Sequence, residues 1–135
     1  MDIFIASDHA GFRLKEFLKK HFELIDLGTD SESSCDYPIF AKKLAEKING
    51  ENCGILICGT GIGMSIAANR FSHIRAALCV NETMAELARQ HNDANVLVLG
   101  ARIIFEDTAL KCVEKFLSTD FEGGRHQRRI SLINF

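Results

Sequence analysis

The chain has 135 residues, of which 47% are hydrophobic and 25% charged, and its formal net charge is −2 at pH 7. A globular chain of this length forms one domain and buries roughly two thirds of its surface. The small negative charge argues against a nucleic-acid or membrane partner, and no apolar run is long enough for a signal peptide or a membrane span.

Strand-like and helix-like segments alternate five times from the N-terminus. The expected strands cover residues 3–6, 22–27, 53–58, 75–80 and 95–99. A helix is expected after each strand, and the last of these helices carries apolar residues from Ala109 to Leu117. This alternation predicts a single domain over residues 1–135. Its fold class is α/β, a three-layer α/β/α sandwich of Rossmann-like type with a five-stranded parallel sheet.

The five cysteines occur without a C-x-x-C pair. They are Cys35, Cys53, Cys58, Cys79 and Cys112. An odd number without a paired motif favours free thiols in a reducing compartment over a disulfide framework or a zinc site. We therefore expect a cytoplasmic protein.

The most informative stretch covers residues 54–65, where an apolar strand ends at Cys58 and a glycine-rich loop opens the next helix. Glycines at 59, 61 and 63 expose backbone amides, and the helix adds its positive dipole end. This dipole favours a thiolate at Cys58. The pattern predicts a cradle for an anion, although a tight turn with an inert buried thiol also fits these residues. It matches neither a dinucleotide fingerprint nor a P-loop.

Other polar residues follow the expected strands or lie near the chain end. Asp8 and His9 follow the first strand and Arg102 the fifth, so the carboxyl edge of the sheet gathers them near Cys58. His91 ends a helix and is placed less firmly. Asp8 also fits a helix cap, and His91 a solvated helix end. The arginines at 125 and 129 are either one side of a helical tail or a solvated basic pair.

Six motifs occur in order along the chain: SDHAG at 7–11, DYP at 36–38, ICGTGIG at 57–63, RQHND at 89–93, GAR at 100–102 and EGGRH at 122–126. Together they resemble the ribose/galactose isomerase family, which contains type B ribose-5-phosphate isomerases and galactose-6-phosphate isomerase subunits. The resemblance covers essentially the whole chain.

The resemblance implies an aldose–ketose isomerase that interconverts D-ribose 5-phosphate and D-ribulose 5-phosphate in the non-oxidative pentose phosphate pathway. The reaction passes through an enediolate, without a metal or an organic cofactor. By similarity, Cys58 is the base that moves the proton, and Thr60 orients its thiol. His91 donates a proton as the sugar ring opens, with Asp8 nearby. Met64 occupies the position where another branch of the family has a glutamate, so Cys58 is the only candidate base in the loop.

The resemblance also assigns the substrate contacts. The phosphate contacts are assigned to basic side chains, and the sugar contacts to three further residues and the loop amides. The phosphate positions are His9, Arg102, Arg125 and Arg129; the sugar positions are Asp8, Tyr37 and Asn92; the loop positions are Gly59, Thr60, Gly61, Ile62 and Gly63.

Family members form homodimers, some of which pair further into tetramers, and their active sites combine residues of both subunits. We accordingly expect the tail 120–135 to pack on a partner subunit and its arginines to reach a site whose Cys58 belongs to the other chain. Two alternatives remain open from the sequence. One is an isomerase of a six-carbon phosphosugar, galactose 6-phosphate or allose 6-phosphate; the other is a non-catalytic phosphate-binding domain of flavodoxin-like type.

Overall fold

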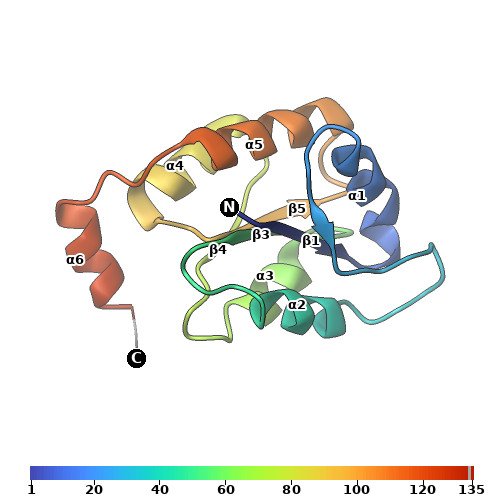
Figure 1. The fold of residues 1–135 in the computed structure, drawn as a ribbon, viewed down its shortest axis with the longest axis horizontal. Helices are drawn as coiled ribbons and strands as arrows, with labels where there is room; N and C mark the ends of the chain where they lie inside the picture. The colour runs from blue at the N-terminus through green and yellow to red at the C-terminus, as the bar shows by residue number, and fades with distance from the viewer. Residues whose placement is uncertain (134) are drawn as a thin grey trace.

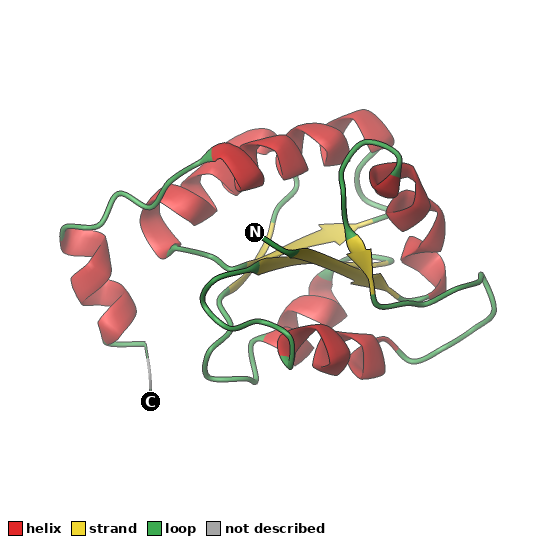
Figure 2. Ribbon diagram, in the orientation of Figure 1, coloured by secondary structure: helices red, strands yellow, loops and turns green. Residues whose placement is uncertain are grey.

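The computed structural model describes residues 1–133 and 135, and it is a sheet covered by helices on both faces (Figures 1 and 2). The strands are β1 (Ile3–Ser7), β2 (Ile25–Asp26), β3 (Cys53–Cys58), β4 (Ala76–Leu78) and β5 (Val96–Gly100). The helices are η1 (His9–Gly11, a 3-10 turn), α1 (Phe12–Lys19), α2 (Tyr37–Ala45), α3 (Ile62–Ala68), α4 (Glu82–Asn92), α5 (Glu106–Ser118) and α6 (Arg125–Ser131). The predicted three-layer α/β/α sandwich is confirmed.

All strand pairs are parallel, and the order across the sheet is β2-β1-β3-β5-β4. The chain leaves β1 toward one side of the sheet and β3 toward the other, so the winding reverses between these two strands. In this arrangement the ends of β1, β3 and β5 lie side by side, because Ser7 pairs with Ile57 and Cys58 pairs with Gly100. The carboxyl edge beside such a reversal is where parallel sheets bind ligands.

The core has two parts, one on each face of the sheet. Along β3 the side chains alternate: Ile55 and Ile57 pack with α1, α4 and α5, whereas Leu56 and Cys58 pack with α2 and α3. Both faces of β3 are fully covered, which explains its continuous apolar sequence. The alternation also directs the Cys58 side chain toward α3, the helix that the glycine loop opens.

Helix α6 stands apart from the sandwich, beyond the edge where the strands begin (Figure 1). It follows Gly123 and Gly124, both of which have positive φ. The sequence predicted a tail here, with a helix only as one alternative, and the structure has that helix. No helix in residues 1–133 and 135 is long and apolar enough to cross a membrane.

Two predicted strands are shorter than the pattern indicated. The strand expected at 22–27 covers only Ile25–Asp26, because the amide of Phe22 still bonds to the Leu18 carbonyl at the end of α1. The strand expected at 75–80 covers Ala76–Leu78 at the edge of the sheet. In both places apolar side chains outside the short strand still pack against the core, although their backbone does not continue the strand.

Candidate active site

The Cys58 thiol receives a hydrogen bond from the glycine loop. Cys58 is the last residue of β3 and is 5% exposed, and the Gly61 amide donates to its sulfur at 3.2 Å. A backbone N–H aimed at sulfur stabilises negative charge there. The loop therefore aims one backbone donor directly at the Cys58 sulfur.

Only glycine fits at position 61. Its φ is +82°, in the left-handed region, and a Cβ there would lie 2.4 Å from Cδ1 of Leu78. L-residues rarely adopt this conformation, and the contact with Leu78 leaves no room for a side chain. Gly61 thus turns the chain from β3 into α3 and points its own amide back at Cys58.

The first turn of α3 adds further donors. The Ile62 amide donates to Oγ1 of Thr60 at 3.2 Å, so this hydroxyl caps the loop. The next two amides, of Gly63 and Met64, have no hydrogen-bond acceptor in residues 1–133 and 135. The hydrogen bond to the thiol comes from the Gly61 amide, and a role of Thr60 in orienting the thiol stays a prediction. Two unpaired amides beside a thiolate can hold an oxyanion.

Two side chains flank the loop. A Cβ at Gly63 would lie 2.6 Å from the ring of Tyr37, and a Cβ at Gly59 would lie 2.9 Å from Nη1 of Arg102. Both side chains therefore pack directly on glycine backbone, at positions where any larger residue would displace them. The structure brings Arg102 to the same edge as Cys58, as the order of strands and polar residues predicted, and it also places Tyr37 there.

Asp8 and His9 follow β1 at this edge. Asp8 is buried and caps the 3-10 turn, with Oδ1 accepting from the Gly11 amide at 3.2 Å. This confirms the helix-cap interpretation of Asp8. The Cys35 amide donates to Nδ1 of His9 at 3.2 Å. That bond assigns the lone pair to Nδ1, so Nε2 carries the proton of the neutral ring and is free to donate to a ligand.

The remaining predicted site residues lie at the opposite edge of the sheet. His91 and Asn92 end α4, which begins at the carboxyl edge and finishes where β5 begins, and Arg125 and Arg129 belong to α6. Within one chain the predicted site residues thus form two separate groups. We call them the thiol edge (Asp8, His9, Tyr37, Cys58, residues 59–63 and Arg102) and the histidine edge (His91, Asn92, Arg125 and Arg129).

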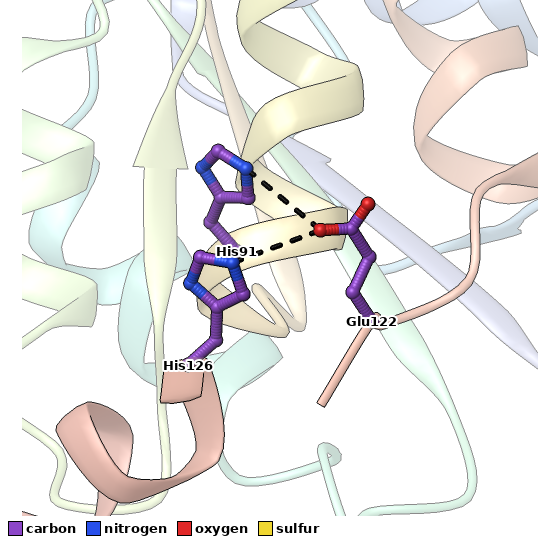
Figure 3. A group of neighbouring side chains, drawn as sticks. All are labelled: His91, Glu122 and His126. Carbon is purple, nitrogen blue, oxygen red and sulfur yellow. Dashed lines mark ion pairs between the residues drawn. The ribbon is translucent and has the colours of Figure 1, made fainter. Parts of the chain in front are cut away.

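The histidine edge contains two residues that the sequence did not assign, Glu122 and His126 (Figure 3). The rings of His91 and His126 stack with centroids 4.3 Å apart and an interplanar angle of 13°. Both Nε2 atoms face Oε1 of Glu122, at 4.0 Å from His91 and 3.6 Å from His126. Desolvation of its covered ring lowers the pKa of His126, and the charges of His91 and Arg125 lower it further. A sequence signal existed, because Glu122 and His126 are four residues apart and lie within one of the family motifs.

Cys35 is a third residue that the sequence did not assign. Its amide fixes His9, and its sulfur lies 3.9 Å from the same Nδ1. It belongs to the polar loop between β2 and α2, where no strand or helix period fixes its position. Only the folded chain shows that this loop reaches the thiol edge.

A cavity of about 490 Å³ opens on the histidine edge, not on the thiol edge. Asn92, Phe71 and Ile133 are among the residues that line it, and Cys58 and the glycines are not. This cavity therefore lies away from the glycine loop of the same chain.

The sequence profile of the Ribose/Galactose Isomerase family matches residues 3–133. A curated relative, ribose-5-phosphate isomerase B of Escherichia coli, is 45% identical over 97% of this chain and 93% of its own length.

Solved structures agree with the profile. A ribose 5-phosphate isomerase from Thermotoga maritima superposes with a TM-score of 0.94 and 55% identity over 98% of this chain and 97% of that chain. Ribose-5-phosphate isomerase B from Mycoplasma genitalium, solved with bound ribulose-5-phosphate, superposes with a TM-score of 0.89. It is 46% identical over 98% of this chain and 93% of that chain.

Proposed function

The chain belongs to the ribose/galactose isomerase family, and from that premise we propose that it interconverts D-ribose 5-phosphate and D-ribulose 5-phosphate. The observation that carries the proposal is the Gly61 amide bonded to the Cys58 sulfur at 3.2 Å, beside two unpaired amides. A proton transfer between an aldose and a ketose needs these two functional groups, a base and a site for an oxyanion. The relative from Mycoplasma genitalium that binds ribulose-5-phosphate supports the choice of substrate.

Cys58 acts as the base in this proposal. Its thiolate takes the proton from C2 of the open-chain aldose and returns a proton to C1, while the hydroxyl proton moves from O2 to O1. The net change is one C–H bond broken and one formed, so no oxidant, reductant or cofactor is required. Met64 is fully buried in the core on the α2 and α3 face and carries no titratable group, which leaves Cys58 as the base of the loop.

The unpaired amides of Gly63 and Met64 hold the negative oxygen of the enediolate. They belong to the first turn of α3, so their direction is fixed before the substrate arrives. One oxyanion donor of this kind is worth roughly 3–4 kcal/mol of transition-state stabilisation. Because the charge develops only as the proton leaves C2, these donors favour the transition state over the bound sugar.

In this proposal the phosphate is bound by arginine side chains and a histidine N–H, at the end of the sugar away from Cys58. His9 presents its Nε2 proton, because Nδ1 is occupied by the Cys35 amide. Arg102 lies on Gly59, and its guanidinium fork suits two phosphate oxygens. Arg125 and Arg129 are exposed on α6 and four residues apart, so they lie on one side of that helix. Tyr37 and Asn92 contact the sugar between the two ends.

Two chains share each active site in this proposal. The thiol edge and the histidine edge lie on opposite edges of one sheet, so the His91 that opens the ring and the arginines of α6 come from a second copy. Exposed apolar side chains at both places support such contacts, Ile62 and Ile66 on α3 and Leu132 near the C-terminus. The tail 120–135 then packs on the partner of a homodimer.

A mixed dimer tests the shared site. Cys58→Ala and His91→Ala each inactivate the homodimer, but a heterodimer of the two variants keeps one intact site of two. Co-expression with two tags and purification of the heterodimer should give about half of the wild-type turnover. A heterodimer of Cys58→Ala with Arg102→Ala, two variants of the same edge, keeps no intact site and is the matched control. Equal, negligible turnover in both heterodimers would contradict sharing between chains.

Turnover of five-carbon and six-carbon phosphosugars tests the substrate. Ribose 5-phosphate should be isomerised with a higher kcat/KM than allose 6-phosphate or galactose 6-phosphate, measured side by side on the same preparation. A preference for either hexose phosphate would contradict the proposal. The assignment to the non-oxidative pentose phosphate pathway follows from this substrate pair, and the expected cytoplasmic location stays part of the proposal because the five cysteines are free thiols.

A further inference from the structure

The side chains of His91, Glu122 and His126 converge on one point of the histidine edge (Figure 3). One ligand atom from each residue lies within 4.8 Å of the other two. In residues 1–133 and 135 this is the one group of three or more histidine, cysteine or acidic side chains that meets this spacing. Two imidazoles and one carboxylate are a common ligand set for zinc.

The spacing is close to that of a bound ion. Two ligands that are each about 2.1 Å from a tetrahedral zinc ion lie roughly 3.4 Å apart. The observed separations from Oε1 of Glu122 are 3.6 Å to Nε2 of His126 and 4.0 Å to Nε2 of His91. Small side-chain rotations that move these atoms by a few tenths of an ångström bring Oε1 of Glu122 and Nε2 of His126 to the separation expected around zinc. Turning the His91 ring out of its stack with His126 shortens the second separation and points both lone pairs at one ion.

The backbone holds these residues together without an ion. The Glu122 amide donates to the Gln90 carbonyl at 3.1 Å, and Nε of Arg89 donates to the Thr119 carbonyl at 3.2 Å. The segment that carries Glu122 is therefore fastened along the end of α4, next to His91. The His126 side chain is only 10% exposed, so its ring is also confined. Such preorganisation lowers the entropic cost of binding an ion.

The cluster is also accessible, and its surroundings select the ion. The side chains of His91 and Glu122 are 40% and 52% exposed, which leaves coordination positions for water or a ligand. Arg125 and Arg129 add positive charge close to His126 and oppose any cation. Hard ions that depend on carboxylates, Mg²⁺ and Ca²⁺, lose more from this repulsion than ions that form strong bonds to imidazole.

We propose that His91, Glu122 and His126 form a binding site for a divalent transition-metal ion of the Zn²⁺ type, and that the bound ion inhibits the isomerase. The ion is not a cofactor of the reaction. It occupies Nε2 of His91, which then has no proton to donate when the sugar ring opens. The site rests on the geometry alone, whereas the inhibition rests also on the role proposed for His91.

Cobalt absorption tests the site directly. Co²⁺ is titrated into the wild type, Glu122→Gln and His126→Gln, with His21→Gln as a control for an exposed histidine outside the cluster. Visible d–d bands should appear in the wild type and in His21→Gln without the near-ultraviolet charge-transfer band of a thiolate, which excludes the five cysteines as ligands. The two cluster variants should bind Co²⁺ at least about tenfold more weakly, since even outer-shell partners contribute 10- to 100-fold to metal affinity.

Turnover measured in the presence of Zn²⁺ tests the second part of the proposal, that the bound ion inhibits the isomerase. The Zn²⁺ concentration that halves turnover should rise at least about tenfold in Glu122→Gln and His126→Gln, each compared with its own metal-free rate, and should stay unchanged in His21→Gln. Equal Co²⁺ binding in all four proteins, or a thiolate band, would overturn the site. Binding that is lost in the variants while zinc leaves wild-type turnover unchanged would overturn the inhibition. Absence of metal-free turnover would instead contradict the proposed function, and the cobalt titration still decides the site.

Discussion

The thiol edge and the histidine edge of this sheet differ in the kind of chemical group that they present. At the thiol edge, backbone amides, glycines and a 5% exposed thiol are fixed by β3 and the first turn of α3. At the histidine edge, the predicted site residues are side chains of α4 and α6, and the His91 side chain is 40% exposed. Backbone groups cannot change rotamer, so they suit a reaction that needs a fixed geometry. Long charged side chains suit recognition of a phosphate and assembly with a second chain.

The difference between the two edges underlies the proposal that two chains share each active site. The thiol edge holds the proposed base and oxyanion donors, while the cavity of about 490 Å³ lies at the histidine edge, where Asn92 lines it. If two chains associate with the thiol edge of one against the histidine edge of the other, the base and the oxyanion donors meet the basic side chains and the cavity. Chemistry and recognition then separate by edge, and substitutions at the two edges should have different kinetic signatures.

Replacing Cys58 should have the largest effect. Cys58→Ala removes the proposed base, and kcat should fall by roughly 10²- to 10⁴-fold, the usual contribution of a positioned base, since no other loop residue replaces it. Ribose 5-phosphate binding, measured by calorimetry, should persist because the phosphate contacts remain. Turnover within tenfold of the wild type would exclude Cys58 as the base and remove the main distinction between the edges.

Replacing the α6 arginines should instead weaken binding. Arg125→Ala or Arg129→Ala each removes a charge-assisted phosphate contact worth about 1.5–3 kcal/mol, so KM should rise roughly 10- to 100-fold with a smaller change in kcat. Arg128→Ala, on the neighbouring position of the same exposed helix, is the matched control and should behave as the wild type. If all three variants gave the same kinetics, α6 would have no specific role in binding.

Gly61→Ala should affect both chemistry and stability. The left-handed φ of +82° and the 2.4 Å approach to Leu78 predict a loss of about 1–3 kcal/mol in the free energy of unfolding. The loop must shift, so the amide moves away from Cys58 and kcat falls. Gly50→Ala is the control, because Gly50 has φ +89° but nothing within 4 Å of its Cβ. It should lose stability by about 1 kcal/mol, by urea denaturation, and keep its kcat.

The ion pairs of the two edges should differ in their effect on stability. The Lys15 side chain is fully buried and pairs with Asp26 at 2.6 Å, at the carboxyl end of β2. Asp26→Asn leaves that charge with Glu16 at 3.1 Å as its remaining partner and should cost about 2 kcal/mol, less than the loss of a fully buried pair because the Asp26 side chain is 26% exposed. Asp93→Asn, at the histidine edge, loses two more exposed pairs and should cost about 0.5–1 kcal/mol. Equal losses in urea denaturation would contradict this contrast.

The contribution of the Lys15–Asp26 pair to the free energy of unfolding should decrease at acid pH. Burial raises the pKa of Asp26, but hydrogen bonds from Lys15, Lys19 and the Gly28 amide outweigh it and hold that pKa below its ordinary value. A carboxyl whose folded pKa is lowered stabilises the fold above its unfolded pKa, and this contribution disappears as the pH falls through the folded value. The stability difference between wild type and Asp26→Asn should therefore shrink below about pH 4. A difference that does not change with pH would contradict this ionic origin.

The strongest local patterns predicted the fold most accurately. The strand expected at 53–58 matches β3, since a continuous apolar run bounded by glycine is typical of a buried parallel strand. The weakest match was the strand at 22–27, of which only two residues join the sheet. There the apolar side chains of Phe22 and Leu24 pack against the core from a non-strand backbone, and hydrophobic periodicity cannot separate these cases.

By itself the sequence determined the α/β alternation, the family and the thiol at the end of β3, because these depend on residue types and spacings that are local in the chain. The tertiary structure decided the strand order that pairs β5 with β3, the Gly61 amide as the partner of Cys58, and the separation of His91 from the glycine loop. It also brought Glu122 and His126 to His91. Such contacts depend on how distant segments pack around the sheet, and their free energy comes from burial and hydrogen bonds that no local pattern records.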